Sequence, residues 1–126
     1  MSKQKITILP NEFTIHRFEA TEPIPQKIFE SKYYWIGKTE EELSVVCDSK
    51  IKLNNSKSDG NWSILKLVGQ FDFSIIGILA NITRALSEAG ISIVALSTYD
   101  TDNIMVKTIK VQQAIKVLTD VGYIVD

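Results

Sequence analysis

The fold is decided by residues 62–125, which have the sequence WSILKLVGQFDFSIIGILANITRALSEAGISIVALSTYDTDNIMVKTIKVQQAIKVLTDVGYIV. Apolar residues first alternate with polar ones, as in a half-buried strand, and then recur with helical spacing. The patterns follow one another in the order strand, helix, strand, strand, helix, strand. This order predicts a ferredoxin-like βαββαβ unit of the α+β class, with both helices on one face of an antiparallel sheet.

Two glycines mark the predicted helix ends. Apolar residues form one stripe along residues 73–89, and Gly90 follows in a position that favours the left-handed conformation. A second stripe predicts a helix over residues 111–121, which Gly122 ends. Strands are predicted at residues 91–99 and 104–107, joined by the polar turn at 100–103. The glycines therefore mark the C-terminal ends of the two helices, and the turn separates the two strands.

The predicted topology brings two loops to one edge of the sheet. Right-handed crossovers place the hairpin turn at 100–103 beside the strand-to-helix junction at 69–74. Free backbone N–H groups at a helix N-terminus suit a small anion such as a carboxylate. Aspartates beside them suit an ammonium group, so the two loops together would hold an α-amino acid.

The first half is predicted to be mostly β structure. Between two prolines, residues 24–30 have room only for a short helical turn. The polar residues 54–61 are expected to form a mobile connector between subdomains at 1–55 and 56–126. Each subdomain is too small to bury a large core alone, so we expect the two to pack together. The predicted strands of the first half are at 6–9, 13–18, 33–38 and 43–48.

Composition excludes several classes of partner. The chain has 126 residues and a formal net charge of −1, which provides no long-range field for nucleic acid or a membrane surface. No apolar run has the length that crosses a bilayer. The single cysteine, Cys47, allows no internal disulfide and agrees with a reducing compartment, so we expect a cytoplasmic protein.

Residues 56–126 resemble an ACT domain, a small regulatory βαββαβ module that binds amino acids. The resemblance is carried by the junction Gly69-Gln70-Phe71-Asp72-Phe73-Ser74, the helix exit at 88–93 and the segment 97–102. Together with residues 42–47, these segments resemble small bacterial proteins made of two ACT-like units, related to the CASTOR type of amino-acid sensor. The resemblance implies that the first half is a degenerate, β-rich ACT-like unit without a full helix.

The sequence also departs from the commoner ACT pattern. That pattern has an Asp followed by Pro-Gly at the helix start, whereas Asp72 here precedes Phe73 and Ser74. It also has an Asn in the strand after the helix, where this chain has Ser92. The departures leave the identity of the ligand open and do not change the predicted fold.

The resemblance and the predicted topology give nine candidate ligand-binding residues, and several have a structural explanation as well. Tight helix packing and room for a ligand explain Gly77 equally well. Helix capping explains Asp72, and hydrogen bonds within a hairpin turn explain Asp100 and Asp102. The candidates are Gly69, Phe71, Asp72, Phe73, Ser74, Gly77, Ser97, Asp100 and Asp102.

No catalytic or metal-binding pattern is present in the sequence. The glycine and the distal glutamate of an EF-hand loop are absent after Asp100, and no zinc spacing occurs. His16 and Cys47 lie in strand patterns, which disfavours a catalytic pair. We therefore expect no cofactor, and favour a non-enzymatic regulatory protein that binds an amino acid and forms a homodimer. The alternative is a protein interaction module with a vestigial ligand site.

Overall fold

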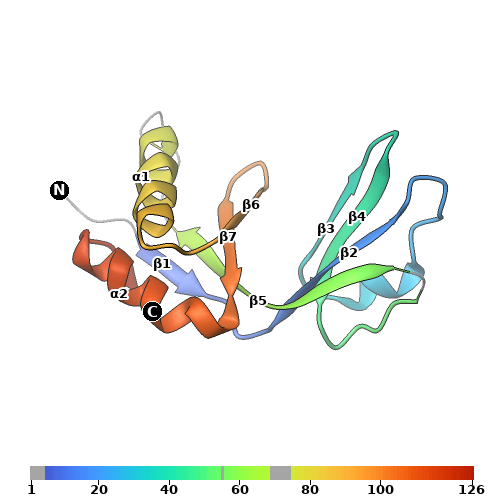
Figure 1. Cartoon of the computed structure of the whole chain (residues 1–126), viewed down its shortest axis with the longest axis horizontal. Helices are drawn as coiled ribbons and strands as arrows, with labels where there is room; N and C mark the ends of the chain where they lie inside the picture. The colour runs from blue at the N-terminus through green and yellow to red at the C-terminus, as the bar shows by residue number, and fades with distance from the viewer. Residues whose placement is uncertain (1–4, 55, 69–74) are drawn as a thin grey trace. The chain divides into compact units, whose positions relative to one another are not determined.

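The computed structural model describes residues 5–54, 56–68 and 75–126 (Figure 1). The chain divides into two compact units. Unit 1 comprises residues 1–10 and 63–126, and unit 2 comprises residues 11–62. One long strand, β5 (Lys57–Val68), begins in unit 2 and ends in unit 1.

Unit 1 has the predicted ferredoxin-like order from β5 to β8. The strand β7 pairs with both β5 and β6, as a hairpin beside the first strand requires. The order βαββαβ of the α+β prediction is thereby confirmed. The other elements of unit 1 are β1 (Lys5–Ile8), α1 (Ile75–Glu88), β6 (Val94–Ser97), β7 (Asp102–Lys107), the 3₁₀ turn η2 (Thr108–Lys110), α2 (Val111–Asp120) and β8 (Ile124–Val125).

Both helices of unit 1 bury an apolar stripe against the sheet. Ile82 and Leu86 of α1 are fully buried, as are Ala114 and Leu118 of α2. They join one cluster with strand residues from β1, β5 and β7. The strand residues of this cluster are Ile6, Leu65, Leu67, Ile104 and Val106.

The two glycines end the helices as predicted. Gly90 and Gly122 have φ angles of 77° and 103°. Beyond Gly90, the N–H of Ile91 donates to the carbonyl of Leu86 at 3.0 Å. Beyond Gly122, the N–H of Tyr123 donates in the same way to Leu118. This is the Schellman pattern, which satisfies carbonyls at the end of a helix.

The N-terminal strand, β1, is part of unit 1 and does not pair with the other described strands of the first half of the sequence. β1 pairs antiparallel with β5 and parallel with β8, and so lies between them. Ile6 is fully buried in the core of unit 1. The compact units therefore have other boundaries than the predicted subdomains at 1–55 and 56–126. Alternation identifies a strand, but it does not identify the distant strand with which it pairs.

The predicted mobile connector at 54–61 is wrong over most of its length. Lys57, Ser58 and Asp59 begin β5 and pair with β2, opposite Arg17, His16 and Ile15 respectively. The side chains at 57–59 are exposed, so no apolar alternation marks this end of the strand. Backbone pairing alone makes it a strand. The predicted strand at 91–99 is likewise shorter, since β6 covers only Val94–Ser97.

Unit 2 is β-rich and has no α-helix among its described residues. Its sheet has the order β3-β4-β2, and β2 continues the pairing to β5. The face that carries Phe18 and Val45 is covered by Ile28 from the 3₁₀ turn and by residues 51–53. The elements of unit 2 are β2 (Phe13–Glu19), the 3₁₀ turn η1 (Gln26–Glu30), β3 (Tyr34–Lys38) and β4 (Glu42–Asp48).

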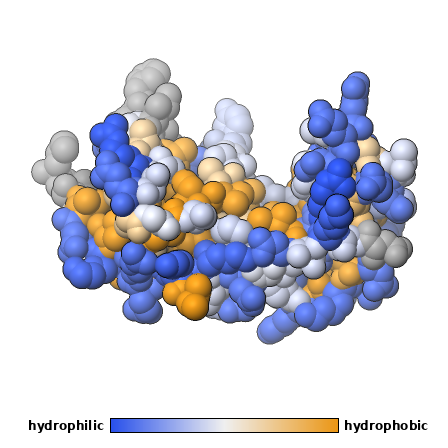
Figure 2. Space-filling model, viewed as in Figure 1, coloured by the Kyte–Doolittle hydropathy of each residue, from blue (hydrophilic) through white to orange (hydrophobic). Residues whose placement is uncertain are grey.

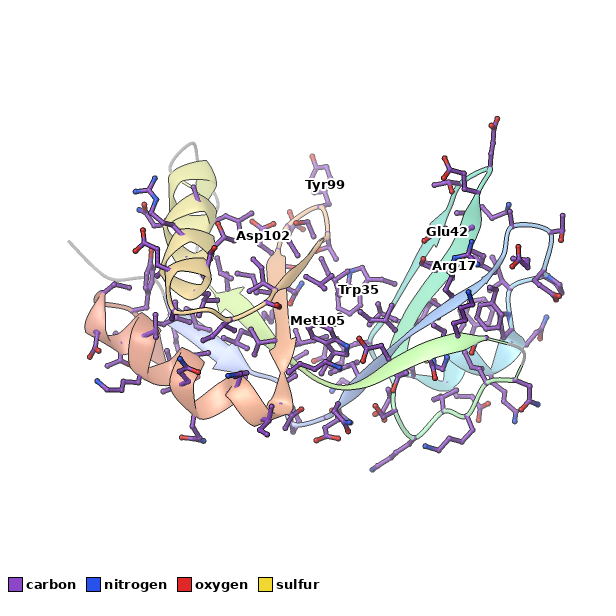
Figure 3. All side chains as sticks on the ribbon, in the orientation of Figure 1. Arg17, Trp35, Glu42, Tyr99, Asp102 and Met105 are labelled. Atoms are coloured by element: carbon purple, nitrogen blue, oxygen red, sulfur yellow. The ribbon has the colours of Figure 1, made fainter. Side chains whose placement is uncertain are left out.

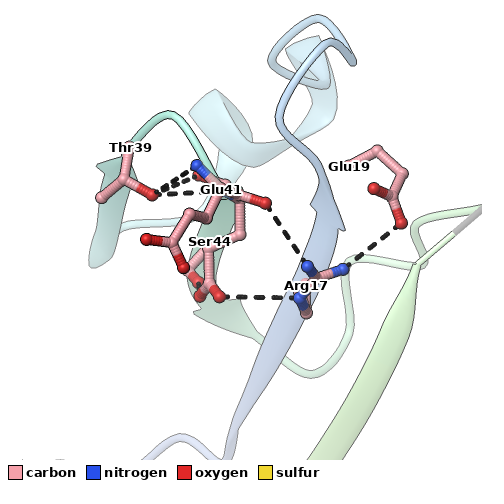
Figure 4. A network of polar contacts seen from close by, with 6 residues as sticks. Arg17, Glu19, Thr39, Glu41 and Ser44 are labelled. Atoms are coloured by element: carbon pink, nitrogen blue, oxygen red, sulfur yellow. Dashed lines mark hydrogen bonds and ion pairs between the residues drawn. The ribbon is translucent and has the colours of Figure 1, made fainter.

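A tight turn joins β3 to β4, as the sequence predicts. The Thr39 hydroxyl accepts hydrogen bonds from the backbone N–H groups of Glu41 and Glu42, at 3.1 and 3.2 Å (Figure 4). Beside it, the Arg17 guanidinium lies 3.6 Å from the Glu42 carboxylate and 3.4 Å from that of Glu19. These groups are partly exposed, and hydrophilic side chains cover this end of unit 2 in Figure 2. We interpret the network as a solvated surface.

Candidate functional site

The end of unit 1 that carries the β6–β7 hairpin contains the described candidates for ligand binding. Gly77 lies near the start of α1, Ser97 ends β6, Asp100 lies in the turn and Asp102 begins β7. Figure 1 shows the start of α1 and the hairpin at the same, upper end of this unit. The remaining candidates lie outside the described residues: Gly69, Phe71, Asp72, Phe73 and Ser74.

Ser97 and Asp102 form a pair across the base of the hairpin. They are directly opposite each other in the register of β6 and β7. The Ser97 hydroxyl donates to Oδ1 of Asp102 at 2.5 Å. This bond fixes the orientation of the Asp102 carboxylate. The second carboxylate oxygen keeps its capacity to accept a hydrogen bond from a ligand.

Threonines close the hairpin turn, so the aspartates are not needed for that purpose. The N–H of Thr98 donates to the carbonyl of Thr101 at 2.9 Å, and the N–H of Thr101 donates to the Thr98 hydroxyl at 3.2 Å. The two hydroxyls also bond to each other. Asp100 is exposed, and its side chain forms no hydrogen bond or ion pair with the described residues. The hairpin-turn explanation therefore does not account for Asp100.

Gly77 lies on an exposed part of α1. Apart from its chain neighbours and the backbone of α1 itself, no atom of the described residues lies within 4 Å of the position where a Cβ would be. Tight packing therefore does not explain this glycine, although glycine in a helix costs about 1 kcal/mol relative to alanine. The open space is consistent with the second explanation, room for a ligand or a partner.

The pairing of β7 with β5 supports part of the predicted convergence. β7 begins at the hairpin, and β5 ends at Val68, immediately before the junction at 69–74. The return strand of the hairpin, β7, thus lies beside β5, the first strand of the βαββαβ unit, as predicted. The approach of the junction itself to the hairpin involves residues outside the described part, so it stays a prediction.

Two residues at this end were not among the candidates. Tyr99 is fully exposed at the tip of the hairpin and points away from the sheet (Figure 3). Asn103 is only 4% exposed and lies in β7 next to Asp102. The sequence does carry a signal for Tyr99, because it is an aromatic residue in an otherwise polar turn. Asn103 was predicted to belong to the turn, and a polar residue in a turn pattern gives no sign of burial.

His16 and Cys47 do not form an activated pair. They lie on adjacent strands, where Cys47 is opposite Thr14 and His16 is opposite Val45. Burial, and then the charge of Asp48, raise the pKa of the Cys47 thiol to about 11. Burial, and then the charge of Lys52, lower the pKa of His16. Both groups are therefore neutral near pH 7, which is the opposite of a thiolate beside an imidazolium.

The described residues contain no group of three or more His, Cys, Asp or Glu side chains arranged to hold a metal ion. Among the same residues, no helix has the length and apolar character that a membrane span requires. The clearest chemistry of the described part is thus the serine and the two aspartates at the hairpin.

Comparisons with known proteins give a family and a fold. A family model for the ACT domain matches residues 57–120, just over half of the chain. A second family model, for an N-terminal domain, matches residues 11–51. No curated protein matches the chain.

Solved structures resemble the chain over nearly its whole length. A crystal structure of a protein from Agrobacterium tumefaciens is 29% identical with a TM-score of 0.92, covering 100% of this chain and 94% of the other. A protein of unknown function from Vibrio cholerae, described as a possible transport protein, is 18% identical with a TM-score of 0.75, covering 94% and 89%. The ligand-free regulatory subunit of aspartate kinase from Thermus thermophilus is 10% identical with a TM-score of 0.67, covering 96% and 99%.

Proposed function

Since the chain belongs to the ACT domain family, we propose that it is a non-enzymatic regulatory protein that binds an amino acid in unit 1. The proposed site lies where α1 begins and the β6–β7 hairpin turns. The observation that carries the proposal is the oriented Ser97–Asp102 pair beside the exposed Asp100. Backbone N–H groups at a helix start suit the carboxylate of an α-amino acid, and an aspartate such as Asp102 suits its ammonium group.

Each candidate has a role in this proposal. Asp102, held by Ser97, accepts hydrogen bonds from the ligand ammonium group, and Asp100 adds negative charge beside it. The junction from Gly69 to Ser74 supplies backbone N–H groups for the ligand carboxylate, and the Asp72 side chain joins Asp102 in binding the ammonium group. Gly77 leaves room for the ligand on α1. Phe71 and Phe73 provide apolar surface for its side chain.

The proposal extends to the rest of the molecule. Unit 2 is β-rich, which is consistent with a degenerate ACT-like first half and with a relationship to the CASTOR type of sensor. We propose that the protein is cytoplasmic, in keeping with its single buried cysteine. We also propose a homodimer, because Ile109 and Ile124 are exposed on unit 1. Light scattering at micromolar concentration tests the dimer, and a monomer of 14.2 kDa would contradict it.

A melting screen with the twenty amino acids tests the proposed ligand class. A ligand at about a hundred times its dissociation constant adds about 2.7 kcal/mol to the free energy of unfolding. We expect stabilisation by one amino acid or a small related group. Asp102→Asn and Asp72→Ala should abolish it, whereas Asp120→Asn, an exposed aspartate on α2, should leave it unchanged. Stabilisation that survives Asp102→Asn would place the ligand elsewhere.

A second candidate function is a protein interaction module with a vestigial ligand site. The observation in its favour is the complete exposure of Tyr99 at the hairpin tip. Aromatic residues of this kind often anchor protein interfaces. Melting that no amino acid alters, together with a stoichiometric partner that Tyr99→Ser releases, would favour this function over amino-acid binding.

A further inference from the structure

A pocket of about 270 Å³ lies within unit 2, on the side of the sheet that η1 covers. It is distinct from the hairpin site, because every residue that lines it belongs to unit 2. Its apolar lining consists of Phe18, Pro23, Pro25 and Leu53. Two lysines, Lys27 and Lys52, line it as well. Apolar walls with a few charged groups are typical of small-molecule sites.

The base of the pocket is continuous with the core of unit 2. Phe18 is only 3% exposed and belongs to the buried cluster with Ile28 and Leu43. Leu53 packs against the same cluster. An apolar group in the pocket would therefore extend an existing core instead of covering an isolated patch.

Local hydrogen bonds hold both walls of the pocket. On the first wall, the N–H of Glu22 donates to Glu19 at 3.0 Å, and Pro23 and Pro25 fix φ without offering an N–H group. On the second wall, the N–H of Lys50 donates to the Asp48 carboxylate at 2.8 Å. The ammonium group of Lys52 donates to the Ser49 carbonyl at 3.0 Å. Because walls held in this way are already ordered, less conformational entropy is lost when a ligand binds.

The charges around the pocket favour a single negative charge on the ligand. Lys27 and Lys52 contribute two positive charges, and Glu22 contributes one negative charge. Neither lysine forms an ion pair with the described residues, and the Lys52 ammonium group has further N–H donors beyond the one bonded to Ser49, so both can bind an anion. A carboxylate near them gains charge-assisted hydrogen bonds, whereas a second negative charge would face Glu22.

We propose that this pocket of unit 2 binds a small monocarboxylate with an aliphatic body. The lysines bind the carboxylate, and Phe18, Leu53 and the two prolines contact the body. The proposal is independent of amino-acid binding in unit 1, because it uses none of the residues at the hairpin. Either site can therefore fail its test without affecting the other.

His16 provides a built-in reporter of this pocket. It is the single histidine of the chain, and its ring stacks on that of Phe18 with centroids 6.2 Å apart. Its Nδ1 lies 3.0 Å from the Ser56 hydroxyl, and Lys52 is the charged side chain that perturbs it. Since the charge of Lys52 helps to lower the pKa of His16, a carboxylate bound to Lys52 should raise that pKa.

The test is an NMR titration of the His16 ring in the full chain with sodium 4-methylpentanoate. Acetate lacks the aliphatic body and 4-methylpentanamide lacks the charge, so both serve as ligand controls at equal ionic strength. We expect 4-methylpentanoate to bind saturably below about 50 mM and to raise the pKa of His16, as a ligand of this size allows. Acetate and the amide should do neither.

Three variants test which groups hold the carboxylate, with the dissociation constant taken from shifts of the Leu53 methyl groups. Lys27→Gln and Lys52→Gln should each weaken binding about tenfold, as the loss of a charge-assisted hydrogen bond predicts. Glu22→Gln should tighten it about threefold. Lys50→Gln is the matched control, since Lys50 is an exposed neighbour that does not line the pocket. It should leave the dissociation constant unchanged.

Three results would overturn the proposal. The first is equal binding of the amide, which would leave the lysines without a role. The second is a rise in the pKa of His16 with acetate that equals the rise with 4-methylpentanoate, which would leave the apolar wall without a role. The third is binding of 4-methylpentanoate that neither lysine variant weakens.

Discussion

Units 1 and 2 cover their sheets in different ways. In unit 1, α1 and α2 place Leu86 and Leu118 on the sheet and bury them completely. In unit 2, a single 3₁₀ turn and the loop at 49–54 perform this role, and Ile28 is the residue that η1 buries. A helix buries three or four side chains in every two turns, whereas a loop buries only those that happen to face inward.

The difference has chemical consequences. Among the described residues, the buried side chains that can titrate, His16 and Cys47, both lie in unit 2. The pocket with two lysines lies beside the loop cover of the same unit. We infer that the helical cover gives unit 1 its stability. Unit 2, under its loop cover, holds the two buried titratable side chains and the pocket that the lysines line.

The largest expected effect comes from truncating the core of each unit. Leu86→Ala should lower the free energy of unfolding by about 3 kcal/mol, because the helix keeps the cavity open. Ile28→Ala should cost less, about 2 kcal/mol, because a short 3₁₀ turn can relax into the space. Urea denaturation measures both. Gln112→Ala, at an exposed site on α2, should stay within about 0.5 kcal/mol.

The comparison would fail at this point if Ile28→Ala proved more costly than Leu86→Ala. That order would mean that the loop cover of unit 2 is the more rigid of the two. The helices of unit 1 would then not be the main source of stability.

The next effect is a loss of stability at high pH that originates in unit 2. The folded state holds the Cys47 proton up to a pKa of about 11, against an ordinary value of 9.0. Stability from this group is therefore complete below pH 9 and is lost as the pH rises towards 11. The loss is on the order of 2 kcal/mol. Urea denaturation of wild type and Cys47→Ala across this range isolates it, and parallel curves would contradict the assignment.

A smaller effect should differ in sign between two glycines of unit 1. Gly90→Ala should destabilise the chain by about 1 kcal/mol, because φ at this position is 77°. Gly77→Ala should stabilise it by up to about 1 kcal/mol, since the helix is preserved and the added methyl group meets open space. Thermal melting measures both. A destabilising Gly77→Ala would show that the position is packed, and would remove the argument for ligand space there.

The sequence was sufficient where structure depends on near neighbours. The stripes of α1 and α2 and the glycines at 90 and 122 follow from local periodicity and backbone preference, and all were predicted. The place of β1 between β5 and β8 was not predicted, because the two partner strands are distant from β1 in the chain. The start of β5 was missed because its first side chains are polar and exposed, so only backbone pairing defines it.

The candidate site shows the same division. The aspartates of the hairpin were candidates from the predicted topology and the family resemblance, and their role in ligand binding stays a proposal. The Ser97–Asp102 hydrogen bond depends on the exact strand register, which the length of the turn sets, and the sequence does not give that register. The unit 2 pocket lies between two loops with no periodic pattern, so nothing in the sequence indicates that they meet.

The most direct test of the account is to map amino-acid binding onto the two units by NMR. The amino acid that stabilises the protein most in the melting screen would be titrated into labelled protein, with backbone amide shifts recorded. We predict saturable shifts in residues 97–102 and at the start of α1, lost in Asp102→Asn and kept in Lys52→Gln. Shifts confined to unit 2, or unchanged by Asp102→Asn, would contradict the assignment of amino-acid binding to unit 1.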